Sequence, residues 1–349
     1  MSTASTALTK SAPVVDERHS MLRHLEQQAL VGDLASDERL DVSFMSRSFC
    51  LTGLPLRKLE QRDFGRKDDH FALSISTAPI PLPGGDNFLP GLPYGAKARL
   101  LVLWMNSQCR MPNRAAGDRW LEIGRVEEWM HELGLPRHHE GVSMTKSQLL
   151  RLSMATFTMV LKEKDQGREY FRSDRLIDSA VFADGDLLHY ANGDLAKVRF
   201  PLGIELTEKA YKNFTSSAVI PIATDALRKI STSAMSIDFF LFLSYRLPEI
   251  PLGDSQLVSW RQLIAWFGNG EPRSKFRQVF ESSIAKALDA YQGANVSITD
   301  EGLIMRYSDP VETRRMFVVS STGSTPKTPL KRVRSNNRVA LRPVETTGA

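Results

Sequence analysis

The chain has 349 residues, of which 42% are hydrophobic and 24% are charged, as is usual for globular proteins. Its length suggests two or three domains, no apolar run approaches the ~18 residues that a membrane span needs, and the N-terminus lacks the apolar region of a secretory signal. Two cysteines, Cys50 and Cys109, are too few for a disulfide framework and are expected to be buried thiols in a reducing cytoplasm.

The net charge of +5 is concentrated at the C-terminus. Residues 321–349 contain six lysines and arginines and a single acid, Glu345, so residues 1–320 sum to zero. A nucleic-acid site in the body of the protein would therefore depend on uneven placement of charge. Residues 320–349 are rich in Ser, Thr, Pro and Arg and are predicted to form a disordered basic tail. Such a tail either strengthens nonspecific phosphate contact or only aids solubility, and both interpretations stay open.

Residues 1–40 are predicted to form an N-terminal extension that is partly helical. The first 14 residues are small and polar, which indicates disorder. A helix is expected over residues 16–36, because Met21, Leu22 and Leu25 fall on one side of it.

After short strands and loops at 41–93, three helices are predicted in the first half of the chain. KARLLVLWMNSQCR (97–110) is strongly apolar, and WLEIGRVEEWMHELGL (120–135) is amphipathic at helical spacing. A longer helix is predicted over 138–164, followed by strand-like segments to about residue 200. The exposed positions expected on this third helix include Lys146, Gln148 and Arg151.

The second half repeats this pattern. SIDFFLFLSYRL (236–247) is apolar nearly all round, as a buried helix would be. A short amphipathic helix from Trp260 is followed by the break GNGEPR and by a longer helix with Ser274 as its expected N-cap. NVSITDEGLIMRY then alternates around Gly302, which favours a hairpin. The apolar stripe expected on the longer helix consists of Phe276, Val279, Phe280, Ile284, Ala287, Leu288 and Tyr291.

The order helix, helix, helix, hairpin indicates a winged helix, although any small helical core with an attached hairpin has the same order. Because both halves show this pattern, we predict an α+β protein of tandem winged-helix domains, each a helix-turn-helix with a β-hairpin wing, between disordered termini. The expected parts are the extension at 1–40, a first winged-helix-like domain with preceding strands at 41–222, a second winged-helix domain at 223–319, and the tail at 320–349.

The ordered series of segments resembles the plasmid-encoded RepA-type replication initiators of Gram-negative bacteria. The resemblance begins with GLPYGAKARLLVLWMNSQCR, WLEIGRVEEWMHELGL and GVSMTKSQLLRLSMATF. It continues through IDFFLFLSYRL, VSWRQLIAWFG, KFRQVFESSIAKAL and VSITDEGLIM. PYGAKARLL is the segment most characteristic of this resemblance, and the whole series covers roughly residues 64–308.

This resemblance implies a cytoplasmic, winged-helix, DNA-binding protein. It would bind repeated sites in double-stranded DNA of a plasmid origin, help to open the adjacent duplex, and recruit the host replication initiator and helicase machinery. Several related initiators exchange between a dimer that represses its own gene and a monomer that activates the origin. No membrane association is implied.

The resemblance places DNA contacts on the third helix of each half. Arg pairs bidentately with guanine and Gln with adenine in the major groove, whereas Lys usually contacts phosphate. Cations at a helix N-terminus interact unfavourably with the helix dipole. A phosphate bound nearby would explain why cations occur there. The alternative is a helix start that is only solvated. The candidates are Arg273, Lys275, Arg277, Gln278 and Lys286 in the second half, and Thr145, Lys146, Gln148 and Arg151 in the first.

The sequence gives little support to an enzyme, and no cofactor or metal is expected. His131, His138, His139 and Glu140 lie close in sequence, but adjacent histidines point apart, and the His-apolar-His motif of rolling-circle nucleases is absent. The phosphate-binding loop GxxxxGK[ST] and the nucleophile elbow GxSxG are absent as well. The alternatives to an initiator are a winged-helix transcriptional repressor, which could be autoregulatory, a protein-binding winged-helix module, and a nickase.

Overall fold

The computed structural model describes much of the chain between residues 42 and 311. The helix expected over 16–36 and the tail at 320–349 lie outside the described residues. None of the helices in the described part is long and apolar enough to cross a membrane. The ranges described are 42–51, 53–68, 71–82, 85–111, 114–124, 130–131, 134–135, 138–163, 168–216, 219–268 and 272–311.

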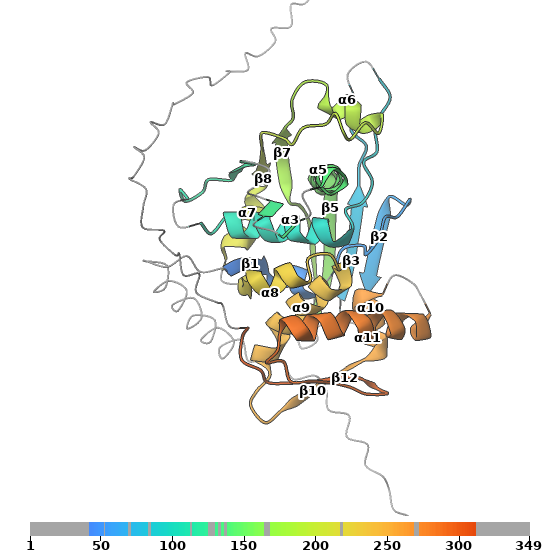
Figure 1. Ribbon diagram of the computed structural model, residues 1–349, viewed down its shortest axis with the longest axis vertical. Coiled ribbons are helices and arrows are strands. Elements are labelled where there is room, and N and C mark those ends of the chain that lie inside the picture. Colours follow the sequence, from blue (N-terminus) through green and yellow to red (C-terminus); the bar gives the residue numbers. More distant parts are fainter. Residues whose placement is uncertain are drawn as a thin grey trace, which may run out of the picture. The chain divides into compact units, whose positions relative to one another are not determined.

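Helices and small antiparallel sheets alternate along the chain, which confirms the α+β class (Figure 1). The first strand pairs with a strand near residue 220, so the two ends of the first half meet. A short helix follows the first strand directly. These elements are β1 (Val42–Ser46), α2 (Arg47–Leu51) and β9 (Val219–Ala223).

A four-stranded antiparallel sheet combines two strands from residues 63–77 with the two strands that follow the third expected helix. That helix ends at Met154, ten residues before its expected end, and the chain continues as a strand. Thr156, Phe157, Thr158 and Val160 favour extended structure, and they pair with the strand at 71–77. The sheet order is β2 (Asp63–Lys67), β3 (Phe71–Thr77), β5 (Ala155–Glu163) and β6 (Arg168–Arg175).

The first expected helix is buried along most of its length, as its apolar composition predicts. The second is only partly as expected, because Trp120–Glu122 forms a strand, Met130 and His131 are helical, and 125–129 lie outside the described residues. The remaining elements of this half are α3 (Gly95–Gln108), β4 (Trp120–Glu122), α5 (His139–Met154), β7 (Ile177–Val181), α6 (Asp186–Ala191), β8 (Gly203–Leu206), α7 (Glu208–Thr215) and α8 (Thr224–Lys229), with the sheet order β4-β8-β7.

The second half has the expected order of three helices and a hairpin, with one strand that the sequence pattern did not predict. This extra strand, β10, precedes the second helix and joins the hairpin in the order β10-β12-β11. A side chain at Gly302 would collide with the Val258 carbonyl oxygen, so the close approach of β10 requires glycine there. The elements are α9 (Ala234–Arg246), η1 (Leu247–Glu249), β10 (Ser255–Ser259), α10 (Trp260–Phe267), α11 (Arg273–Ala290), β11 (Val296–Ile298) and β12 (Gly302–Arg306).

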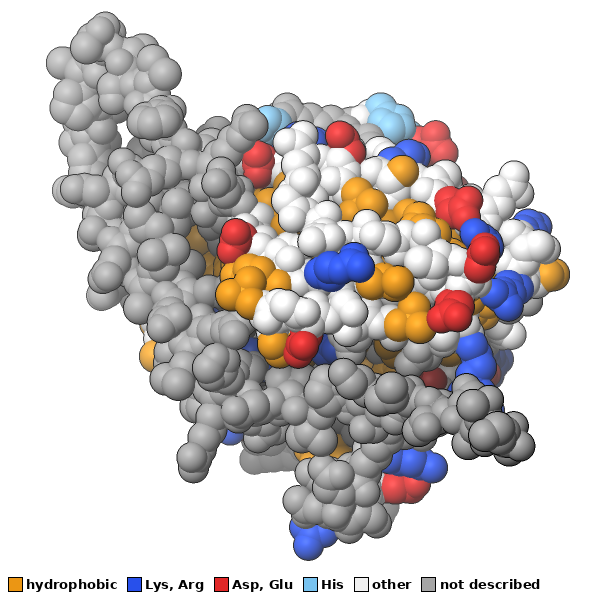
Figure 2. All heavy atoms as spheres, turned by 90° about the horizontal axis from the view of Figure 1, so that it is seen from below, with side chains coloured by type: hydrophobic (Ala, Val, Ile, Leu, Met, Phe, Trp, Pro, Cys, Tyr) orange, Lys and Arg blue, Asp and Glu red, His pale blue; other side chains and the backbone are white. Residues whose placement is uncertain are grey.

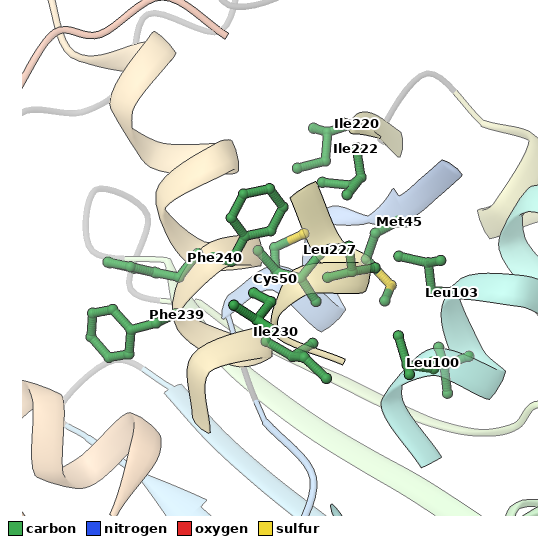
Figure 3. Packing of buried hydrophobic residues seen from close by; sticks show 14 of the residues in the cluster. Met45, Cys50, Leu100, Leu103, Ile220, Ile222, Leu227, Ile230, Phe239 and Phe240 are labelled. Carbon is green, nitrogen blue, oxygen red and sulfur yellow. The ribbon is translucent and has the colours of Figure 1, made fainter. Parts of the chain in front are cut away.

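One cluster of buried hydrophobic residues contains members from both halves of the chain. Figure 3 shows Leu100 and Leu103 of α3 on one side and Phe239 and Phe240 of α9 on the other, with Met45 between them. The cluster therefore continues across the expected domain boundary at 222–223, which itself stays a prediction. In the second half its aromatic rings include Phe239, Trp260, Phe267, Phe276 and Phe280.

Polar contacts also join the halves inside the protein. The Arg99 guanidinium of α3 donates to both carboxylate oxygens of Asp238 in α9, at 2.5 and 2.6 Å, and both side chains are buried. Nearby, Arg66 of β2 donates to the Gly268 carbonyl at the end of α10 (2.8 Å), and Asp68 accepts from the Trp266 indole (2.6 Å). The four-stranded sheet is thus tied to the end of α10, just before α11.

Candidate nucleic-acid interface

α11 is an amphipathic helix whose inner face is fixed by aromatic packing. Phe280 lies edge-on to Phe239 at 4.3 Å between ring centroids and to Trp260 at 5.3 Å. The helix begins at Arg273 after Pro272, so Ser274 lies inside it and is not the expected N-cap. Val279 is 44% exposed, and its expected place in the buried stripe is wrong. At 100° per residue, Val279 lies about 80° from the centre of the buried face, which is at its margin.

The outer face of α11 carries polar side chains in solvent. Lys275, Gln278 and Lys286 are exposed, and within the described part of the chain they have no hydrogen-bond or ion-pair partner. Lys275, Gln278, Val279 and Ser282 follow helical spacing, so they share one side of the helix. This side offers a cation, an amide, a hydroxyl and a small apolar group to whatever approaches it.

Arg273 and Arg277 do not belong to this free set. Arg277 is 37% exposed and donates to Glu281 (2.8 Å) and to Asp300 (3.4 Å), and its guanidinium lies over the Trp260 ring. The hydrogen bond to Glu281 raises the pKa of Arg277. Arg273 donates to the Asp300 carbonyl at 3.2 Å. The two arginines therefore link the hairpin turn to α11, although Arg273 is also exposed, and the expected contact of both with DNA stays a prediction.

The outer face of the three-stranded sheet is not a basic surface. Figure 2 looks at the molecule from the side of β10 and β12, and it shows hydrophobic side chains among neutral polar surface, with basic and acidic side chains interspersed. Leu252, Leu257 and Ile298 are exposed in this region. A polyanion would therefore find its cations along α11 and not on this face.

The corresponding helix of the first half, α5, is differently placed. Thr145 is 0% exposed, and its hydroxyl donates to the Gly141 carbonyl at 2.8 Å. Gln148 is 1% exposed, and its amide oxygen accepts from the Tyr94 backbone N–H at 2.8 Å. The expected exposure of Gln148 is wrong, because the segment before α3 packs on this side of α5. Neither side chain is available at the surface.

The two cations of α5 are also engaged. Lys146 donates to the Val198 carbonyl and lies over the Phe200 ring, and burial lowers its pKa. Arg151 donates to the Leu92 carbonyl (3.2 Å) and lies over the Tyr94 ring, and burial lowers its pKa too. Of the four candidates on α5, Lys146, Gln148 and Arg151 connect the helix to neighbouring segments, and Thr145 bonds within the helix.

The described residues contain no group of three or more His, Cys, Asp or Glu side chains that could hold a metal ion. Cys50 and Cys109 are buried free thiols, as expected. Burial raises the pKa of both, to about 12 for Cys109, so neither is an activated nucleophile.

Residues 92–262 match the sequence model of the family described as plasmid encoded RepA protein. This segment belongs to the plasmid-encoded RepA family. The RepA segment runs from the approach to α3 into α10 and includes α5, whereas α11 lies beyond it. The resemblance in sequence is therefore confirmed, over a narrower range than the expected 64–308.

Two solved structures align with the chain at low similarity. Selenomethionine derivatives of domains 2 and 3 of RctB align with 9% identity, over 72% of this chain and 94% of that one, with a TM-score of 0.43. A structure of RctB domains 2-3 (RctB-155-483) aligns with 8% identity, over 72% and 92%, with a TM-score of 0.42. No curated protein matches the chain.

Proposed function

We propose that this plasmid RepA-type protein initiates replication by binding repeated sites in its plasmid origin through α11. One observation carries the proposal: α11 is anchored by buried rings on one side, and on the other it presents Lys275, Gln278 and Lys286 to solvent with no partner among the described residues. An α-helix fits the B-DNA major groove, and residues near its N-terminus reach base edges. Gln278 would read a base, and Lys275 would contact phosphate.

The second half supports this role as a winged helix. α9, α10 and α11 supply the helices, and the β11–β12 hairpin supplies the wing. Because Arg273 and Arg277 bind the hairpin turn at Asp300, α11 and the wing would meet the duplex as one rigid surface. Asp300 at the turn is acidic and exposed, so contacts with the duplex would come from α11 and the strands of the wing and not from this turn.

The first half has a different part in the proposal. In a tandem winged-helix interpretation, α3 and α5 supply helices of the first half, and β5 and β6 supply its hairpin. Thr145 and Gln148 receive no DNA contact because they are buried, and Lys146 and Arg151 receive none because they bind neighbouring segments. α5 would support the fold.

The remaining steps follow the family. Bound protein would bend the origin, and an AT-rich neighbour would open if the distorted complex gains contacts that offset the deformation. The host initiator and helicase machinery would then be recruited, and exchange between monomer and dimer would regulate the process. No covalent chemistry, metal or cofactor is involved, and the reaction takes place in the cytoplasm.

The proposal is tested by measuring duplex binding against salt concentration, with an origin fragment and a scrambled duplex of equal length. Each phosphate contact should contribute about −0.9 to the slope of log K against log salt. Lys275→Ala should reduce the slope by about one contact. Lys212→Ala on α7, which removes an exposed lysine paired with Glu208, is the matched control. A slope of zero, or equal effects of both variants, would contradict DNA binding through α11.

A further inference from the structure

β6 is an exposed edge strand with two aromatic side chains in solvent. It pairs with β5 along its length, and no strand lies on its other side among the described residues. Tyr170 and Phe171 are 62% and 65% exposed, on opposite faces of the strand. An edge strand offers free backbone groups to another chain, and charged side chains on it oppose pairing with strands that do not complement them. Five of the eight residues of β6 are charged, so a strand that pairs with this edge must complement their charges.

A cavity of about 220 Å³ lies against the same sheet. β3, β5 and β6 form one wall, and residues of α2 and α7 form the other. Tyr170 and Arg172 of β6 line it, so a strand added to β6 would direct alternate side chains toward its mouth. The apolar lining includes Phe49, Leu73, Ile75, Phe157, Met159 and Phe214.

The volume of the cavity limits which groups can occupy it. An apolar cavity of roughly 150 Å³ accommodates a benzene molecule, whereas pockets for cofactors and drug-sized ligands measure roughly 300–1,000 Å³. A space of about 220 Å³ therefore matches one large apolar side chain, such as Phe or Leu, and is too small for a nucleotide.

The charged side chains at the rim of the cavity favour particular residues next to that apolar side chain in the bound segment. Asp174 binds both Arg172 and Lys209, the latter at 2.9 Å, so two cations share one carboxylate. Arg175 donates to the Ser153 carbonyl at 2.6 Å and has no carboxylate partner among the described residues. Three cations thus face a single acid. An incoming segment with acidic side chains would complement this excess.

We propose that β6 and the adjoining cavity bind an extended acidic segment of a partner protein, which adds as a strand to β6 and places one large apolar side chain in the cavity. Main-chain hydrogen bonds would supply affinity, and the cavity would supply specificity. A second copy of β6 fits less well, because its sequence REYFRSDR carries a net positive charge. The β6 site does not include α11, so the test of this proposal does not depend on whether α11 binds DNA.

A library of random ten-residue peptides displayed on phage, selected against the full chain, tests this proposal. The selected peptides should share a Phe, Leu or similar residue flanked by Asp or Glu. A labelled synthetic consensus peptide should then bind at least tenfold more weakly to Met159→Trp, which fills the cavity. It should bind several-fold more weakly to Arg175→Glu, which reverses a rim charge at an exposed position.

Val160→Trp places the same bulk on the opposite face of β5 and should leave peptide binding unchanged. Thermal unfolding verifies that each variant is folded. If Met159→Trp does not fold, peptide binding to Arg175→Glu alone decides the test. The proposal is overturned by the absence of an acidic-apolar consensus, or by equal binding to wild type and variants. Self-association of the wild type that Met159→Trp abolishes, seen by sedimentation velocity, would assign the edge to a second copy and overturn it as well.

Discussion

The third helices of the two halves, α5 and α11, both carry cations that suggest a DNA-reading surface, but only α11 keeps its polar face in solvent. Segments near Tyr94 and Val198 cover the polar side of α5 and bind its side chains. Among the described residues, the polar side of α11 is covered only next to the hairpin, through Arg273 and Arg277. The difference teaches that a polar helix face becomes a binding surface only where no other part of the chain packs on it.

The largest effect is expected at the inner face of α11. Phe280→Ala should lower the free energy of unfolding by about 3–5 kcal/mol, because it removes a ring from a close-packed aromatic cluster. Val279→Ala, one residue earlier and 44% exposed, should change it by less than about 0.5 kcal/mol. Urea denaturation measures both. Equal losses would mean that α11 is buried on both sides, and the contrast with α5 would disappear.

A smaller loss is expected at the polar side of α5. Gln148→Ala should cost about 1–3 kcal/mol of unfolding free energy, since the Tyr94 backbone N–H loses its acceptor. Gln278→Ala on α11 is the matched control and should leave stability within about 0.5 kcal/mol. Chemical denaturation of the two variants side by side decides whether the two glutamines really differ in surroundings.

The same pair should show the reverse order in DNA binding. Gln278→Ala should weaken binding to the origin repeat by about 1–3 kcal/mol, equivalent to roughly 5- to 150-fold, if its amide reads a base. Gln148→Ala should leave the affinity of folded protein unchanged. Fluorescence anisotropy with an origin duplex makes the measurement. A loss that appears only in Gln148→Ala would move the interface to the first half.

The smallest effect is expected at the hairpin. Arg277→Ala removes the links to Glu281 and Asp300 and should speed amide hydrogen exchange in the β11–β12 turn while leaving the core protected. Lys275→Ala, on the free side of the helix, should leave exchange in the turn unchanged. Unaltered exchange in both variants would show that Arg277 does not fix the turn.

The sequence predicted much of the fold and less of the site. The apolar run of α3, the helix pair α10–α11 and the hairpin were readable because local periodicity sets them. β5 was predicted as helix because Thr156–Val160 continues an apolar pattern that only pairing with β3 makes extended. The burial of Gln148 and the pairing of Arg277 with Asp300 depend on contacts distant in the chain, 54 and 23 residues away. Periodicity within one helix carries no information about such contacts.

The ion pair between Arg99 and Asp238 has a practical consequence for anyone who wishes to study the halves separately. Cutting the chain near residue 222 would leave a guanidinium stranded in one fragment and a carboxylate in the other, each in a site built to exclude water. Losing one partner of such a pair typically costs about 3–5 kcal/mol, a large share of what holds a small domain folded. Fragments made at this point should therefore be insoluble alone and regain structure only when expressed together.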